Sequence, residues 1–79
     1  MAKILIVEDM RTQAQLLEHH LAALGHESQW AGNGQEALEY LSRERPDIII
    51  SDVQMPVMNG LELCKEIKAN PALRFIPVI

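Results

Sequence analysis

An α/β fold built on a mostly parallel sheet is predicted by the way two apolar patterns alternate along this chain. Continuous aliphatic runs at residues 4–7 and 48–50 are typical of strands buried on both faces. After each run, apolar residues recur at helical spacing, and glycine or proline punctuates the connections. Such alternation implies right-handed crossovers, with helices packed against the sheet.

The first half of the chain is expected to hold two strands and two helices. Residues 11–24 have leucines at helical spacing, and Gly25 stands where a C-terminal cap is expected. Residues 27–31 suit a short outer strand. Either Asn33 or Gly34 is then expected to cap a second helix, whose predicted apolar face is made of Ala37, Leu38 and Leu41.

The second half is expected to add a strand, a helix and a further strand. The run at residues 48–50 leads directly to Asp52, and a loop punctuated by proline and glycine follows. A third helix is predicted from Leu61, Leu63, Cys64 and Ile67. Residues 75–79 are predicted to begin a fourth strand, so that the order is βαβαβαβ.

Length and charge exclude several classes of protein. The 79 residues are predicted to form one domain, 1–79, and a single cysteine excludes an internal disulfide. The net charge of −4 comes with no basic run, so no direct nucleic-acid partner is expected. The apolar runs are only a few residues long, so no membrane span or membrane partner is expected. A cytoplasmic location follows as the expectation.

Three carboxylates follow two of the predicted buried strands. Glu8 and Asp9 come directly after the first, and Asp52 comes after the third. Functional crevices of open α/β sheets lie at the carboxyl ends of strands, so these acids are expected to meet there. A divalent cation such as Mg²⁺ would relieve their mutual repulsion. The simpler reading, that each acid caps the following helix or loop, remains open.

Three short segments resemble the receiver domain of response regulators. Val7-Glu8-Asp9 follows the first strand, and an aspartate–two residues–Met-Pro pattern, completed by Met58 and Gly60, follows the third. The segment at residues 31–38 also resembles the family's second strand and helix. The resemblance covers essentially the whole chain, and it implies a phosphoacceptor domain of a two-component phosphorelay.

The resemblance also implies a role for each acidic position. Asp52 would accept a phosphoryl group from a histidine kinase or phosphotransfer protein. Mg²⁺ would be bound by Asp9, by Glu8 directly or through water, by Asp52, and by the backbone carbonyl of Gln54. Such a domain is not expected to be an enzyme, beyond phosphorylating and dephosphorylating itself.

The family's flavodoxin-like sheet has five strands, and this chain ends inside the fourth. An incomplete sheet of order 2-1-3-4, lacking the fifth strand and the last helices, is therefore expected. The resemblance implies two further groups that contact the phosphoryl group, a Ser or Thr hydroxyl after strand four and a lysine after strand five. Neither lies within the 79 residues, so switching is expected to be impaired in this chain. The open edge of strand four or the uncovered sheet face is expected to make the chain a homo-oligomer.

Two other classes of protein place functional groups at this edge of an α/β sheet. A magnesium-dependent phosphohydrolase with an aspartyl nucleophile would place that nucleophile after the first strand, with a second acid two positions later. Met10 and Arg11 occupy those later positions here. A flavodoxin-like nucleotide binder would need a phosphate-cradling loop after the first strand, where Glu8 and Asp9 would instead repel phosphate.

Overall fold

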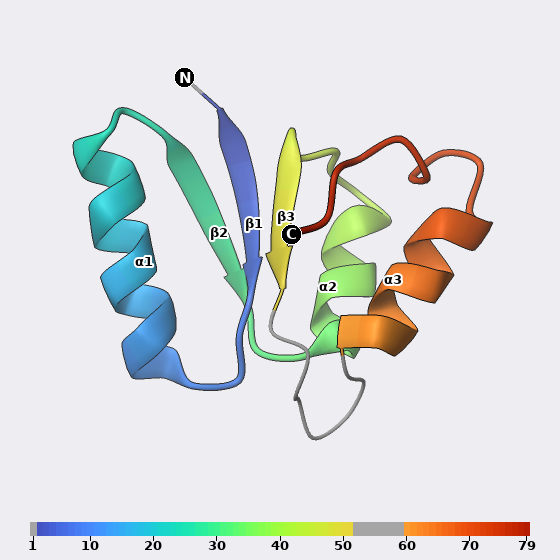
Figure 1. The fold of residues 1–79 in the computed structure, drawn as a ribbon, viewed down its shortest axis with the longest axis horizontal. Coiled ribbons are helices and arrows are strands. Elements are labelled where there is room, and N and C mark those ends of the chain that lie inside the picture. Colours follow the sequence, from blue (N-terminus) through green and yellow to red (C-terminus); the bar gives the residue numbers. More distant parts are fainter. Residues whose placement is uncertain (1, 52–59) are drawn as a thin grey trace.

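The three helices and the first three strands occur in the predicted order (Figure 1). The structure is a computed structural model and describes residues 2–51 and 60–79. The elements are β1 (Lys3–Val7), α1 (Arg11–Ala23), β2 (Glu27–Ala31), α2 (Gly34–Leu41), β3 (Ile48–Ser51) and α3 (Gly60–Ala69).

The strands form one parallel sheet with β1 in the centre. Their order is β2-β1-β3. Val7, the last residue of β1, pairs with Ala31 at the end of β2 and with Ser51 at the end of β3. The carboxyl ends of all three strands therefore lie in register at one edge of the sheet.

The predicted fourth strand is reduced to a single bridge between Val78 and Ile49. The Ile49 N–H donates to the Pro77 carbonyl at 2.9 Å, and the Ile79 N–H donates to the Ile49 carbonyl at 2.8 Å. Prediction of a strand from Phe75 onward was wrong, because residues 71–75 form turns and Pro77 has no N–H to donate. The bridge still places this segment beside β3, as the order 2-1-3-4 requires.

The two faces of the sheet are covered unequally. Figure 1 shows α1 on one side of the sheet and α2 with α3 on the other. On the side of α2 and α3, the core contains Leu5, Val7, Ala31, Ala37, Leu41, Ile49, Leu63, Ile67 and Leu73. On the side of α1, the buried residues are Ile4, Ile6 and Ala14, with other apolar side chains only partly buried.

The expectation of aliphatic side chains left open to water holds for β3 and not for β1. Ile48 and Ile50 of β3 are half-buried on the α1 side. Ile4 and Ile6 of β1 are buried, with exposed fractions of 5% and 1%. The difference arises because Ile4 and Ile6 form one buried cluster with Ala14 of α1, whereas Ile48 and Ile50 pack only against the margin of that cluster.

Local chemistry explains where the helices begin and end. Asn33 caps α2, since its side chain accepts a hydrogen bond from the Glu36 N–H at 2.9 Å. Gly25 follows α1 with a φ of +86°, a left-handed conformation that glycine adopts without strain. Leu24, the last leucine of the predicted helix at residues 11–24, is 73% exposed because it is the C-terminal cap residue and lies beyond the packed face.

Candidate functional site

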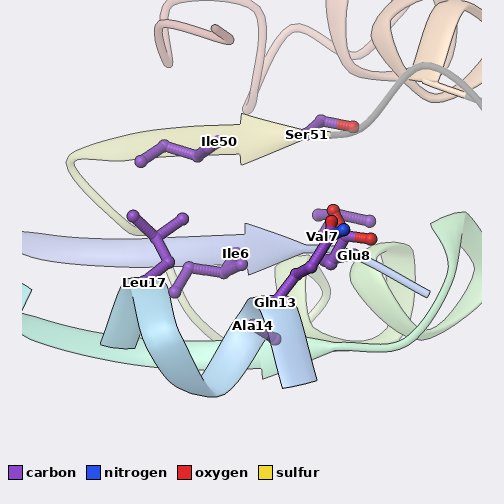
Figure 2. Close-up of a pocket in the computed structure, with 8 residues that line it drawn as sticks. All are labelled: Ile6, Val7, Glu8, Gln13, Ala14, Leu17, Ile50 and Ser51. Atoms are coloured by element: carbon purple, nitrogen blue, oxygen red, sulfur yellow. The ribbon is translucent and has the colours of Figure 1, made fainter. Parts of the chain in front are cut away.

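The ends of β1 and β3 meet at the edge of the sheet, where the acidic residues were predicted. Val7 and Ser51 are register partners, so Glu8 and Ser51 lie at the same end of neighbouring strands (Figure 2). Asp52 follows Ser51 in the chain, and Asp52 and Gln54 lie outside the described residues. The structure therefore brings together the two strand tips that the prediction needed.

Glu8 is tied to its surroundings through both its backbone and its side chain. Its N–H donates to the Ala31 carbonyl at 3.0 Å, which extends the sheet pairing by one residue. Its carbonyl accepts a hydrogen bond from the indole Nε1 of Trp30 at 2.6 Å. Its carboxylate Oε1 accepts a hydrogen bond from the Met10 N–H at 3.2 Å. Part of the capping role considered for Glu8 is thus real, because its carboxylate closes the turn that leads into α1.

Asp9 lies at that turn and is exposed. It follows the half-buried Glu8, and α1 begins two residues later at Arg11. Met10 is the N-cap residue of α1 and makes no side-chain capping bond. The turn thus presents the Asp9 side chain to solvent at the edge where Ser51 ends β3.

A groove reaches this edge from between α1 and β3 (Figure 2). Five of its eight lining residues are apolar, and Glu8 and Ser51 lie at one end of it. The groove is lined by Ile6, Val7, Glu8, Gln13, Ala14, Leu17, Ile50 and Ser51. The half-buried face of β3 and the predicted site are therefore adjacent.

Sequence reasoning placed residues 27–31 in an outer strand and missed Trp30 as part of this edge. It is the only tryptophan of the chain, and its side chain is 38% exposed. The Arg11 guanidinium carbon lies 6.0 Å from the centre of its ring. A tryptophan at the carboxyl end of an edge strand, beside a turn that carries acids, was the available signal.

The predicted metal set is not assembled within the described part of the chain. Among residues 2–51 and 60–79, no group of three or more histidine, cysteine, aspartate or glutamate side chains is placed to hold a metal ion. The predicted set includes Asp52, which falls outside those ranges. In the same ranges, no helix is long and apolar enough to cross a membrane.

Comparison with known proteins shows to which family this chain belongs. The family model of the response regulator receiver domain matches residues 4–79. The chain therefore belongs to the receiver-domain family of two-component response regulators, and its fold is the flavodoxin-like fold of that family, here with an incomplete sheet.

Individual relatives agree with this assignment. The chain is 42% identical over 78 residues to the response regulator PleD of Caulobacter vibrioides, covering 99% of this chain and 17% of that protein. It is 41% identical over 76 residues to the polar-differentiation response regulator DivK of Brucella anthropi, covering 96% of this chain and 62% of that protein. The chain thus spans less than two thirds of either relative.

Solved structures give the same fold. A signal receiver domain of a signal transduction histidine kinase from Syntrophus aciditrophicus superposes with a TM-score of 0.96 and 51% identity, covering 99% of this chain and 59% of that one. The Vibrio cholerae chemotaxis protein CheY4 superposes with a TM-score of 0.92 and 41% identity, covering 99% and 65%.

Proposed function

We propose that this chain accepts a phosphoryl group on Asp52 from a histidine kinase or phosphotransfer protein. The observation that carries the proposal is the register pairing of Val7 with Ser51. Each partner is followed directly by an acid, Glu8 after Val7 and Asp52 after Ser51. Since consecutive Cα atoms are about 3.8 Å apart, one peptide unit separates each acid from the paired position.

The available donor atoms fit magnesium. Carboxylates of Glu8, Asp9 and Asp52 and the backbone carbonyl of Gln54 are hard oxygen ligands, which Mg²⁺ prefers while it keeps several waters. Because the Glu8 carboxylate already accepts a hydrogen bond from Met10, contact through a water suits Glu8, and direct contact suits the exposed Asp9. Bound Mg²⁺ would neutralise negative charge that otherwise keeps a phosphoryl donor away.

The transfer itself makes one bond and breaks another. A carboxylate oxygen of Asp52 would form a bond to phosphorus while the phosphorus–nitrogen bond of a phosphohistidine breaks. The nitrogen keeps the bonding electron pair, and the product on this chain is an acyl phosphate. The chain then serves as a cytoplasmic signalling domain that changes its own phosphorylation state, and it does not turn over an external substrate.

For these 79 residues on their own, we propose impaired switching and self-association. The positions at which the family reads the phosphoryl group follow strands four and five, beyond Ile79. The half-buried Ile48 and Ile50 beside the groove, and the outer side of the segment at Val78, offer surface that a second copy can cover.

Phosphorylation is tested with a phosphorylated phosphotransfer protein or a small phosphoramidate donor, with and without Mg²⁺. Intact-mass spectrometry should show a gain of one phosphoryl group that requires Mg²⁺ and disappears in Asp52→Asn. Asp47→Asn is the matched control, because the Asp47 carboxylate accepts the Lys3 N–H at the amino end of the sheet, away from Glu8. An Asp52→Asn protein that is still phosphorylated would contradict the proposal, and steady turnover of a small phosphate ester would favour the phosphohydrolase.

Impaired switching is tested by titrating beryllofluoride with Mg²⁺ into this chain and into one extended through a fifth strand. The 79 residues should show a smaller spectroscopic response, and an equal response would contradict the proposal. Self-association is tested by light scattering, in which a mass equal to one chain at high concentration would be the contrary result. Ile50→Lys should lower the associated fraction if the groove face is the contact.

A further inference from the structure

We infer that Trp30 is a positioning residue for the metal site, holding the turn that carries Glu8 and Asp9. The inference rests on the proposed function, because the ion to be positioned is the Mg²⁺ of that site. It concerns a side chain on β2, which contributes no ligand to the proposed metal set.

The first contact fixes the peptide unit between the two acids. Trp30 Nε1 donates to the Glu8 carbonyl at 2.6 Å, from a residue 22 positions away in the sequence. That carbonyl belongs to the planar peptide group that also contains the Cα of Asp9. The hydrogen bond from the indole to this oxygen therefore restrains the position of the Asp9 Cα, from which the side chain extends.

The neighbouring peptide group is held by the same strand. The Glu8 N–H donates to the Ala31 carbonyl at 3.0 Å, and Ala31 is the residue after Trp30. Consecutive residues of β2 thus bind the N–H and the C=O of one residue, Glu8. Rotation of the Glu8 backbone would break one of these bonds, so its orientation is fixed relative to β2.

The second contact of Trp30 lies at the far end of the turn. Trp30 pairs with Ile6 in the sheet, and Ile6 packs on the side of α1. The Arg11 guanidinium, at the first residue of α1, lies 6.0 Å from the ring centre, which is cation–π range. One ring therefore contacts both Glu8 and Arg11, the residues that flank Asp9 and Met10.

Such restraint matters for a metal that tolerates little distortion. Mg²⁺ demands near-octahedral geometry, so ligands that are already in place lose less conformational freedom on binding. Without the indole bond, the Glu8–Asp9 peptide can sample more orientations, and the ion must select one. Affinity for Mg²⁺ should fall even in a chain that remains folded.

The test compares Mg²⁺ affinity and stability in matched variants. Trp30→Phe removes the N–H while keeping an aromatic ring for Arg11. Tyr40→Phe is the control, since it also deletes one polar group from an aromatic residue, on α2 at the opposite face of the sheet, where the hydroxyl has no hydrogen-bond partner within the described residues. Calorimetry should show Mg²⁺ binding about three- to tenfold weaker in Trp30→Phe and unchanged in Tyr40→Phe.

Each outcome separates the inference from the proposed function. If the unchanged chain binds no Mg²⁺, the proposed function fails, and the inference fails with it. If the unchanged chain binds Mg²⁺ and folded Trp30→Phe binds it equally well, only the inference fails. That conclusion holds even if Trp30→Phe is less stable than the unchanged chain in urea without metal. Should Trp30→Phe not fold, the indole N–H resonance of the unchanged chain decides: it must shift as Mg²⁺ is added, and a constant resonance overturns the inference.

Discussion

Two consecutive isoleucines of β3 allow a direct test of the unequal cover on the sheet. Ile49 is 0% exposed and packs on the side of α2 and α3. Ile50 points to the other face, where it is half-buried and lines the groove beside α1. Replacing each by alanine removes the same atoms from the same strand, so the comparison isolates the effect of how well each face of the sheet is covered.

The expected cost is larger for Ile49. Three buried carbons at about 0.8 kcal/mol each give about 2.4 kcal/mol, and the cavity left in a closed core raises the loss for Ile49→Ala to about 3–4 kcal/mol. At Ile50 roughly half of the side chain is already in water, and the space that is left opens into the groove. Ile50→Ala should therefore cost only about 1 kcal/mol.

Urea unfolding followed by circular dichroism measures both variants, at two protein concentrations so that self-association is separated from folding. Equal losses in the two variants would refute the unequal cover of β3. The total stability of a domain this small is on the order of 4–12 kcal/mol, so Ile49→Ala is able to unfold it. In that event Ile49→Val and Ile50→Val, with losses of about 1 and below about 0.5 kcal/mol, make the same comparison.

Three further predictions concern local structure and charge. Asn33→Ala should lower the unfolding free energy by about 1 kcal/mol, because the Glu36 N–H loses its acceptor. Asn33→Asp should lose much less, because its carboxylate can still accept that hydrogen bond. Equal losses of the two variants in urea would contradict the capping role. Gly25→Ala should lower the unfolding free energy by about 1 kcal/mol through its φ of +86° alone, since an added Cβ meets nothing within 4 Å. Gly25→Asn should lower it less, because Asn tolerates this conformation better. A Gly25→Ala variant of unchanged stability would contradict the prediction. The hydrogen bond from Lys3 to Glu44 raises the pKa of Lys3 above its ordinary 10.5. The contribution of this pair to stability is therefore complete below about pH 10.5 and is lost as the pH rises through the folded pKa of Lys3. Thermal unfolding of Lys3→Met should lack that part of the pH dependence. An unchanged profile in Lys3→Met would contradict the prediction.

Much of the fold could be predicted because its signals are local. Aliphatic runs at residues 4–7 and 48–50 identified the central strands, and Asn33 and Gly25 act as helix caps for reasons contained in a few neighbouring residues. The predicted strand at residues 75–79 is confirmed only as the bridge at Val78, because Phe75 lies in a turn and Pro77 has no N–H to donate.

The candidate site was predictable only in part. That Glu8 would follow the end of β1 and meet the end of β3 came from strand order, and the pairing of Val7 with Ser51 confirmed it. The assignment of Mg²⁺ to these acids, and of phosphorylation to Asp52, stays a prediction. The contact of Trp30 with Glu8 was missed, because it joins residues from different strands and depends on the face that β2 presents.

Six of the elements, their order, and the acids that follow the strands could be predicted from local sequence, because hydrophobic period, capping and turn chemistry act over a few residues. How these elements pack together is seen only in the folded chain. Packing of α1 against the sheet buries Ile6 and leaves Ile50 half-buried, and the fold brings the Trp30 indole to the Glu8 carbonyl. Such contacts depend on strand register and helix position, which result from packing the whole chain around one sheet.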